Sequence, residues 1–131
     1  MTGITKLDHV NLRTTRLEAQ IAWYTEVLGF ESGPRPNFPF PGAWMYRNGH
    51  ALVHLVGVDA APGEHDNLKM EHVAFASTGL AEFIAHLEQR GETYRKGRVK
   101  DFGITQINVW DADGNHLHID FRGEDGEDTT V

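Results

Sequence analysis

Histidine is the residue type whose number and spacing in this chain point most directly to chemistry. The 131 residues contain eight histidines and no cysteine. Neutral imidazole is a frequent ligand of zinc, iron, nickel and copper, whereas the absence of cysteine excludes thiolate sites, disulfides and a cysteine nucleophile. Four segments with the alternating apolar pattern of β-strands each carry a candidate histidine, namely His9, His54, His72 and His118. A metal site built on strands is therefore the first hypothesis.

The elements that would position these histidines repeat along the chain. The segment 6–12 resembles the segment 69–75, and His72 follows His9 by 63 residues (72 − 9). Each segment is followed by two hydroxyl residues, at 14–15 and 77–78, which are expected to cap a helix. The apolar stripes of the two predicted helices are Leu17, Ile21 and Tyr24 in the first, and Leu80, Phe83, Ile84 and Leu87 in the second. Gly29 and Gly91 are expected to end these helices.

Three strands are predicted after each helix. They cover about 30–32, 43–47 and 50–56 in the first half, and about 93–99, 104–110 and 115–121 in the second. Asn48-Gly49 predicts a hairpin turn, and 111–114 predicts the last connection. The fold class is therefore α+β, with two tandem βαβββ modules in a single domain over 1–122. Module one covers about 4–56, a linker covers 57–68, module two covers about 69–121, and 123–131 is an acidic tail that we expect to be disordered.

Strand alternation assigns the histidines to one face of each sheet. Leu117, Ile119 and Phe121 form an apolar set that should lie beneath a helix, so His116, His118 and Asp120 should share the opposite face.

The same pattern applies to the other three strands that carry a candidate histidine. Ala51, Val53 and Leu55 should face the helix, and His54 should face away from it with His50 and Leu52. His9 and His72 should likewise point away from the helices.

Imidazoles gathered on one face without a cation would repel each other on protonation and leave polar nitrogens unsatisfied. We therefore expect a divalent metal ion, such as Zn, Fe, Ni or Mn, with His9, His72, His118 and His54 as ligands.

Other roles remain open for several histidines. A histidine that opens a strand is often only a hydrogen-bonded residue, and three protein ligands suffice for a catalytic metal, which leaves the role of His54 open. His116 and Asp120 are interpreted as pocket wall or as partners of the ligands. His50, His65 and His86 are interpreted as turn, linker and helix-surface residues.

Four segments, 7–10, 22–30, 71–75 and 111–118, resemble the vicinal oxygen chelate superfamily. That superfamily includes glyoxalase I, extradiol dioxygenases, fosfomycin-resistance enzymes, methylmalonyl-CoA epimerase and bleomycin-resistance proteins, and the resemblance covers 2–121. It implies a curved, cup-shaped mixed sheet with helices on its outer face, often completed by dimerisation. It also implies a metal held from the first and last strands of each module. Members usually have glutamate where His118 stands, so the carboxylate of the iron-dependent ring-cleaving members is missing from its place.

The function expected from this resemblance is a divalent-metal-dependent enzyme of glyoxalase-like lyase/isomerase or dioxygenase type. Its substrate would be a small oxygenated or aromatic molecule that chelates the metal. An all-histidine shell would leave the full charge of the ion in place and make it a strong Lewis acid. Two alternatives are a metal-free ligand- or antibiotic-sequestering protein of the bleomycin-resistance type, and a metal-binding or ligand-sensing protein without turnover.

The residues expected to bind the substrate lie mainly in the proline-rich stretch 33–42 and just beyond it. We interpret the stretch as an aromatic lid, with Arg35 available for a substrate anion; the alternative is a rigid surface loop. The predicted substrate-binding residues are Arg35, Phe38, Phe40, Trp44, His116 and Asp120. No catalytic residue is assigned, although Asp120, His116 or Tyr94 could act as a general base.

Composition narrows the choice of partners and compartment. Four acidic residues in the tail supply more than half of the formal net charge of −7, and no basic stripe is present, so nucleic acid is not an expected partner. No apolar run approaches the roughly 20 residues of a membrane span, and the start shows no secretory signal. We expect a cytoplasmic protein that binds a small molecule, does not bind membranes and forms a homodimer.

Overall fold

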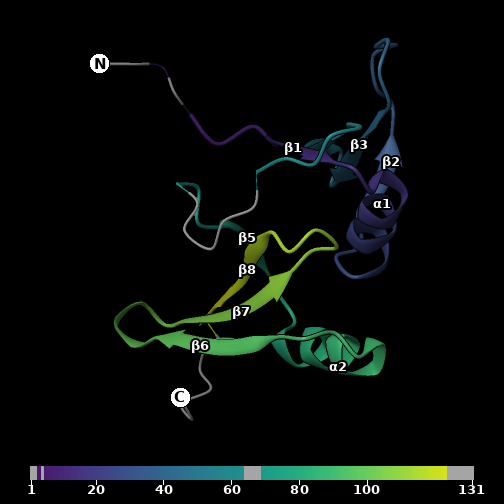
Figure 1. Cartoon of the computed structure of the whole chain (residues 1–131). Helices are drawn as coiled ribbons and strands as arrows, with labels where there is room; N and C mark the ends of the chain where they lie inside the picture. The colour runs from purple at the N-terminus through teal and green to yellow at the C-terminus, as the bar shows by residue number, and fades with distance from the viewer. Residues whose placement is uncertain (1–2, 4, 64–68, 124–131) are drawn as a thin grey trace. The chain divides into compact units, whose positions relative to one another are not determined.

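The chain separates into two compact units, each with one helix and one four-stranded sheet (Figure 1). The structure is a computed structural model that describes residues 3, 5–63 and 69–123. The units are Met1–Glu64 and His65–Val131, and the boundary falls within the expected connection 57–68. His65 and all of the predicted acidic tail except Gly123 lie outside the described residues.

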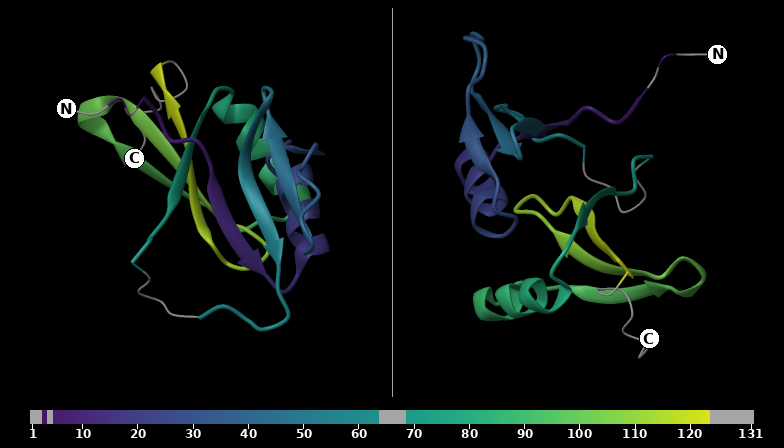
Figure 2. Two further views of the ribbon diagram at one scale, coloured as in Figure 1. Left: turned by 90° about the horizontal axis from the view of Figure 1, so that it is seen from above. Right: turned by 180° about the vertical axis from the view of Figure 1, so that it is seen from behind.

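The first unit has the element order β1, α1, β2, β3, β4. The second has the order β5, α2, β6, β7, β8, with a short 3₁₀ helix, η1, between β6 and β7. The sheet orders are β1-β4-β3-β2 and β5-β8-β7-β6, and in each sheet the first and last strands run parallel while the other pairs are antiparallel. Both units are therefore βαβββ modules, which confirms the predicted α+β class, and Figure 2 shows each from two further directions.

The bounds of these elements lie close to those predicted, apart from the unpredicted η1 and from β1 and β5, which begin one residue after His9 and His72 although the pattern placed these histidines within strands. They are β1 (Val10–Thr14), α1 (Leu17–Glu26), β2 (Glu31–Gly33), β3 (Gly42–Arg47), β4 (His50–Gly57), β5 (Val73–Ser77), α2 (Leu80–Arg90), β6 (Arg95–Val99), η1 (Lys100–Phe102), β7 (Ile104–Trp110) and β8 (His116–Arg122). Within the described ranges, no helix has the length and apolar character needed to cross a membrane.

The predicted apolar face of β8 forms the core of the second unit. Leu117, Ile119 and Phe121 are all buried, and the ring of Phe83 on α2 lies 5.8 Å from that of Phe121. Because side chains alternate along a strand, this packing forces His116, His118 and Asp120 onto the face away from the helix. The prediction of the two faces is thereby confirmed for β8.

The buried residues of α1 differ in part from the predicted apolar stripe of this helix. Tyr24 is buried as expected, but Leu17 and Ile21 are only half-buried, and Trp23 and Gln20 are buried in addition. The Tyr24 ring contacts both Trp23 and Phe30, so the large aromatic side chains, rather than Leu17 and Ile21, define the buried side of this helix.

The predicted helix ends are confirmed, but the predicted hydroxyl caps are wrong. Gly91 adopts φ +72° at the end of α2 and Gly29 adopts φ +75° after α1, a backbone region that glycine occupies without steric cost. The N-cap residues are Arg16 and Gly79, and neither helix start has a side-chain cap. Thr14 instead accepts a hydrogen bond from the backbone N–H of Arg16, because the chain enters the helix two residues later than a cap at Thr14 would require.

The connection between β7 and β8 fixes the register on which the second site depends. The buried Asp111 carboxylate accepts hydrogen bonds from the backbone N–H groups of Asp113 and Asn115, at 3.0 and 2.9 Å, and from the Asn115 side chain at 2.9 Å. This closed turn pairs Trp110 with His116 and, two residues further along, Asn108 with His118. Residues 111–115, which belong to one of the four segments that resemble the vicinal oxygen chelate superfamily, thus form the turn that places the histidines of β8.

Candidate functional site

In the first unit, strand pairing brings two of the predicted ligands into ring contact. β1 and β4 are parallel with Asn11 opposite His54, and His9 precedes Asn11 by two residues, so it lies on the same face. The imidazoles of His9 and His54 stack with their centroids 3.8 Å apart and 9° between their planes. Trp44, opposite His54 on β3, stacks on the same imidazole at 4.0 Å and 13°. Since two rings cannot share one face at such distances, His54 lies between Trp44 and His9.

The second unit repeats this arrangement on the other pair of predicted ligands. β5 and β8 are parallel with Ala74 opposite His118, and His72 precedes Ala74 by two residues. The imidazoles of His72 and His118 stack with a centroid distance of 3.8 Å and an interplanar angle of 18°. Asn108 occupies the place opposite His118 that Trp44 occupies opposite His54. It stays a prediction that the two histidine pairs bind the same ion.

Three of the four histidines have a carboxylate at Nδ1. Asp8 lies 2.7 Å from Nδ1 of His9, Glu71 is hydrogen-bonded to Nδ1 of His72, and Asp120 Oδ1 lies 3.5 Å from Nδ1 of His118. An ionised carboxylate can only accept, so the hydrogen of the neutral His9 and His72 rings belongs on Nδ1 and the lone pair on Nε2. The negative charge of Asp120 beside Nδ1 favours the same tautomer in His118. Histidines that bind metals commonly have this arrangement, because the carboxylate fixes the tautomer and the ring orientation.

His54 differs from the other three in its hydrogen bonding. Its Nε2 lies 3.2 Å from the backbone carbonyl of Ala51, an acceptor, so the hydrogen belongs on Nε2 and the lone pair on Nδ1. His54 would therefore bind an ion through a different nitrogen from His9, His72 and His118. His54, whose role as a ligand the sequence left open, thus also differs from the other three histidines in its tautomer.

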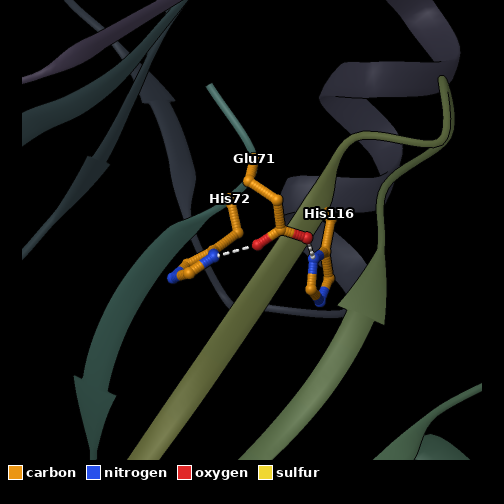
Figure 3. Close-up of side chains that lie close together, drawn as sticks. All are labelled: Glu71, His72 and His116. Carbon is orange, nitrogen blue, oxygen red and sulfur yellow. Dashed lines mark hydrogen bonds and ion pairs between the residues drawn. The ribbon is translucent and has the colours of Figure 1, made fainter. Parts of the chain in front are cut away.

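Glu71 is a site residue that the sequence reasoning missed. Its carboxylate bridges His72 and His116, with Oε2 at 3.0 Å from Nδ1 of His116 (Figure 3). One potential ligand atom from each of these three residues lies within 4.8 Å of the others, so they too could contribute to holding a metal ion. A signal was present in the sequence, because Glu71 precedes His72 as Asp8 precedes His9.

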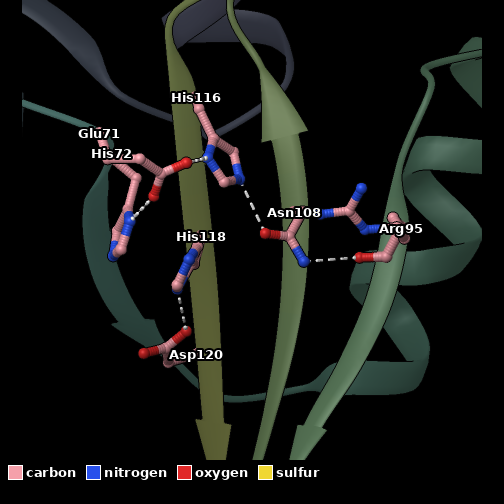
Figure 4. A network of polar contacts seen from close by, with 7 residues as sticks. All are labelled: Glu71, His72, Arg95, Asn108, His116, His118 and Asp120. Atoms are coloured by element: carbon pink, nitrogen blue, oxygen red, sulfur yellow. Dashed lines mark hydrogen bonds and ion pairs between the residues drawn. The ribbon is translucent and has the colours of Figure 1, made fainter. Parts of the chain in front are cut away.

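A polar network behind Glu71 holds His116 in place (Figure 4). Asn108 Nδ2 donates to the backbone carbonyl of Arg95 at 3.1 Å, which turns Asn108 Oδ1 toward His116. Nε2 of His116 lies 2.7 Å from that oxygen and therefore carries a hydrogen. The network thus runs from β6 through β7 and β8 to Glu71 and His72.

The donor set fits a divalent cation by its own chemistry. Nδ1 of His118 and Oδ1 of Asp120 are buried, and within residues 3, 5–63 and 69–123 neither has a hydrogen-bond partner. Their separation of 3.5 Å is too long for a good hydrogen bond. Positive charge at Nε2 of His118 would polarise its Nδ1–H and strengthen the attraction to Asp120, so a cation would relieve this unsatisfied pair.

The electrostatics favour the protonation states that a metal needs. Burial, followed by the charge of His9, lowers the pKa of His54 from its ordinary 6.5, and burial followed by His72 does the same to the pKa of His118. The hydrogen bond with His9 lowers the pKa of Asp8. Hydrogen bonds with His72 and then His116 lower the pKa of Glu71. At neutral pH the carboxylates are therefore ionised, and His54 and His118 are neutral.

The loop 33–42 is organised around Arg35. Its Nη2 donates to the carbonyl of Phe40 at 3.0 Å, and its guanidinium lies 5.0 and 5.1 Å from the ring centroids of Phe38 and Phe40. The two phenylalanine rings stack with each other and remain partly exposed. The predicted role of Arg35, Phe38 and Phe40 in substrate binding stays a prediction, as do those of Trp44, His116 and Asp120.

Two other features lie apart from the histidine pairs. The Tyr94 hydroxyl donates to Glu88 on α2 at 2.7 Å, so Tyr94 contacts the helix and is a poor candidate for the general base. A surface hollow of about 400 Å³ in the first unit is lined by Gly33, Tyr46 and Asn48 among others, but by none of the predicted site residues.

The sequence of the chain is similar to that of a known protein family and of a plant relative. Residues 6–119 match the family described as Glyoxalase/Bleomycin resistance protein/Dioxygenase superfamily. The chain is 29% identical over 127 residues to "Glyoxylase I 4" of Arabidopsis thaliana, covering 88% of this chain and 70% of that protein.

Solved structures share the fold. One is a glyoxylase/bleomycin resistance protein/dioxygenase domain from Frankia sp. EAN1pec, with TM-score 0.77, 19% identity, and coverage of 92% of this chain and 100% of that one. Another is lactoylglutathione lyase from Agrobacterium tumefaciens, with TM-score 0.70, 15% identity, and coverage of 92% and 96%.

The lowered pKa values of His54 and His118 predict how stability depends on pH in the absence of metal. In the unfolded chain these histidines regain a pKa near 6.5, so the unfolded state binds more protons in mildly acidic solution. Their contribution to the free energy of unfolding is fully present above about pH 6.5 and is lost as the pH falls toward the folded-state pKa values. Urea unfolding between pH 7.5 and 5 should show this loss as a fall in the free energy of unfolding. The free energy of unfolding of His118→Asn should depend less steeply on pH. His50→Asn, at an exposed position, serves as the control. If the free energy of unfolding of His118→Asn depends on pH as steeply as that of the wild type, the pKa of His118 is not lowered in the folded state.

Proposed function

This chain belongs to the Glyoxalase/Bleomycin resistance protein/Dioxygenase superfamily, and on that premise we propose that it is a divalent-metal-dependent enzyme of the vicinal oxygen chelate type. Its substrate is a small oxygenated or aromatic molecule. One observation carries the proposal: each unit holds a stacked imidazole pair at 3.8 Å in which the ring before the first strand has a carboxylate at Nδ1.

The histidines present lone pairs suited to a cation. In the described part of the chain, no hydrogen bond uses Nε2 of His9, His72 or His118. Imidazole nitrogen suits zinc, iron or nickel, and manganese is also compatible with a shell that includes carboxylate. A divalent ion bound there would supply Lewis acidity, and a shell of neutral imidazoles would leave its charge unreduced. Asp8 and Glu71 orient His9 and His72, while Trp44 forms a flat wall beside His54.

The contacts of the carboxylates favour lyase or isomerase chemistry over iron-dependent ring cleavage. Ring-cleaving sites of the two-histidine, one-carboxylate kind need a carboxylate that binds the metal directly. Asp120 faces Nδ1 of His118, behind the ligand nitrogen, and Glu71 lies against Nδ1 of both His72 and His116, with Oε2 3.0 Å from the His116 nitrogen. We therefore place proton transfer next to a carbonyl ahead of oxygen insertion. The cytoplasmic location and the homodimer stay predictions.

The second candidate is a metal-free sequestering protein. The exposed phenylalanines of the loop 33–42 and the Trp44 ring would suit an aromatic ligand. The Nδ1 carboxylates count against this candidate, because a binding surface for an aromatic ligand has no need of fixed histidine tautomers.

Metal binding by histidine variants tests the proposed function. The metal-free full chain should take up zinc or cobalt, measured by calorimetry and elemental analysis. His72→Ala and His118→Ala should each weaken binding by more than about 100-fold, since loss of a ligand costs more than loss of a ligand's partner. His50→Ala should bind like the wild type, because His50 is exposed at the hairpin end of β4. Stoichiometric metal in both His72→Ala and His118→Ala contradicts the proposal.

Full-chain samples loaded with zinc and, separately, with ferrous iron distinguish the reaction classes, because only a redox-active ion supports ring cleavage by oxygen. Hydrogen–deuterium exchange next to the carbonyl of a small 2-oxoaldehyde, without oxygen uptake in the presence of catechols, is the expected result. Oxygen uptake with a catechol and no exchange would assign the protein to the dioxygenases.

Glu71 provides a separate prediction, because it contacts His72 without being one of the four predicted ligands. Glu71→Gln keeps an acceptor oxygen but removes the charge, and it should weaken metal binding by about 10- to 100-fold. Nitrogen NMR shifts of the His72 ring should show hydrogen on Nδ1 in the wild type and a mixture of tautomers in the variant. Glu82→Gln, on the exposed side of α2, is the matched control. Unchanged affinity and tautomer in Glu71→Gln would show that Glu71 does not position His72.

A further inference from the structure

A row of side chains crosses the second sheet from the histidine pair to Arg95. Strand register places His118 opposite Asn108, and Asn108 opposite Arg95, so all three lie on the face away from the helix (Figure 4). Neighbouring strands are about 4.8 Å apart, which puts the Cα atoms of His118 and Arg95 about 10 Å apart. Arg95 is thus within reach of a small molecule that touches His118.

The Arg95 side chain is anchored by an aromatic ring and not by an acid. Its guanidinium lies 5.9 Å from the centroid of the Trp110 ring, and Trp110 stacks on His116 at 5.3 Å with 14° between the planes. Arg95 is exposed, and among the residues that the structure describes its guanidinium has no hydrogen bond or acidic partner; only its backbone carbonyl is used, by Asn108. The N–H donors of Arg95 therefore remain available to a ligand.

Arg35, which the sequence analysis predicted to bind a substrate anion, differs from Arg95 because its guanidinium is already engaged. It already donates to the carbonyl of Phe40 and lies over the two phenylalanines of its own loop. An anion that recruited Arg35 would have to compete with these contacts. Arg95 would lose only a cation–π contact at the long end of the usual range, which a bound carboxylate need not break.

We propose that Arg95 and Trp110 form a subsite for a carboxylate of the substrate. Resting on the proposed function, this assigns the substrate class: a small planar molecule with two vicinal oxygens at one end and a carboxylate at the other. Trp110 and His116 present nearly parallel rings to the planar part. The guanidinium fork matches the two oxygens of a carboxylate, which a lysine at this place would not do.

The first test compares two probes that differ by one carboxylate. Catechol and 3,4-dihydroxybenzoate carry the same vicinal oxygens, and their dissociation constants are measured on the zinc-loaded full chain by calorimetry. The ratio of the two constants should favour 3,4-dihydroxybenzoate by about fivefold more in the wild type than in Arg95→Gln, as expected for a charge-assisted contact at an exposed site. Arg95→Lys should retain only part of the preference. Arg90→Gln, an exposed arginine at the end of α2 and the matched control, should retain all of it, and catechol should bind Arg95→Gln as it binds the wild type.

The second test needs no metal. Benzoate is titrated into the metal-free full chain while the Trp110 indole N–H and the Arg95 Nε–H are followed by NMR. Both signals should shift at millimolar benzoate in the wild type and in Arg90→Gln, but the Trp110 signal should not shift in Arg95→Gln.

The two tests separate the subsite from the proposed function. A benzoate response at Trp110 with no metal-dependent binding of catechol would support the subsite and refute the metal-dependent function. Metal-dependent catechol binding with an equal probe ratio in the wild type and Arg95→Gln, and no benzoate response at Trp110, overturns the subsite and leaves the proposed function standing.

Discussion

Two imidazole rings held 3.8 Å apart, one just before the first strand of the unit and one on its last strand, are the constraint on which each unit's site depends. Two positive charges at that distance would repel by about 4 kcal/mol at the effective dielectric constant of a protein surface. Each pair is therefore suited to neutral rings, and neutral rings are what a divalent cation requires. The carboxylates at Nδ1 and the burial of His54 and His118 act in the same direction.

The two units share this pair but surround it differently. In the first unit Trp44 stacks on His54, and the place that matches His116 is occupied by Leu52, so the surroundings are aromatic and apolar. In the second unit Asn108 and His116 take those places and connect Glu71 to the backbone of β6. Both units thus hold a stacked histidine pair at matching positions, and the surroundings of the pair are polar only in the second unit.

The repeated segments, the helical stripes and the turn glycines were enough to predict the fold class and the helix ends. Strand alternation predicted the face of β8 on which His116 and His118 lie. It could not predict which residues meet across strands, because that depends on register, and the register of β8 is set by hydrogen bonds to the buried Asp111. Asn108 was missed for this reason. The conformation of Arg35 depends on contacts inside an irregular loop, for which no periodic pattern exists. The ring nitrogen that each histidine leaves free is a matter of hydrogen-bond geometry, which the sequence indicates only through the acidic residues that precede His9 and His72.

X-ray absorption spectroscopy of the zinc-loaded full chain tests most directly whether the stacked imidazoles bind the ion. The account predicts zinc–nitrogen distances of about 2.0–2.1 Å and the multiple-scattering pattern of two or more imidazoles in the ligand shell. A shell with one imidazole or none, filled by oxygen atoms, would contradict it.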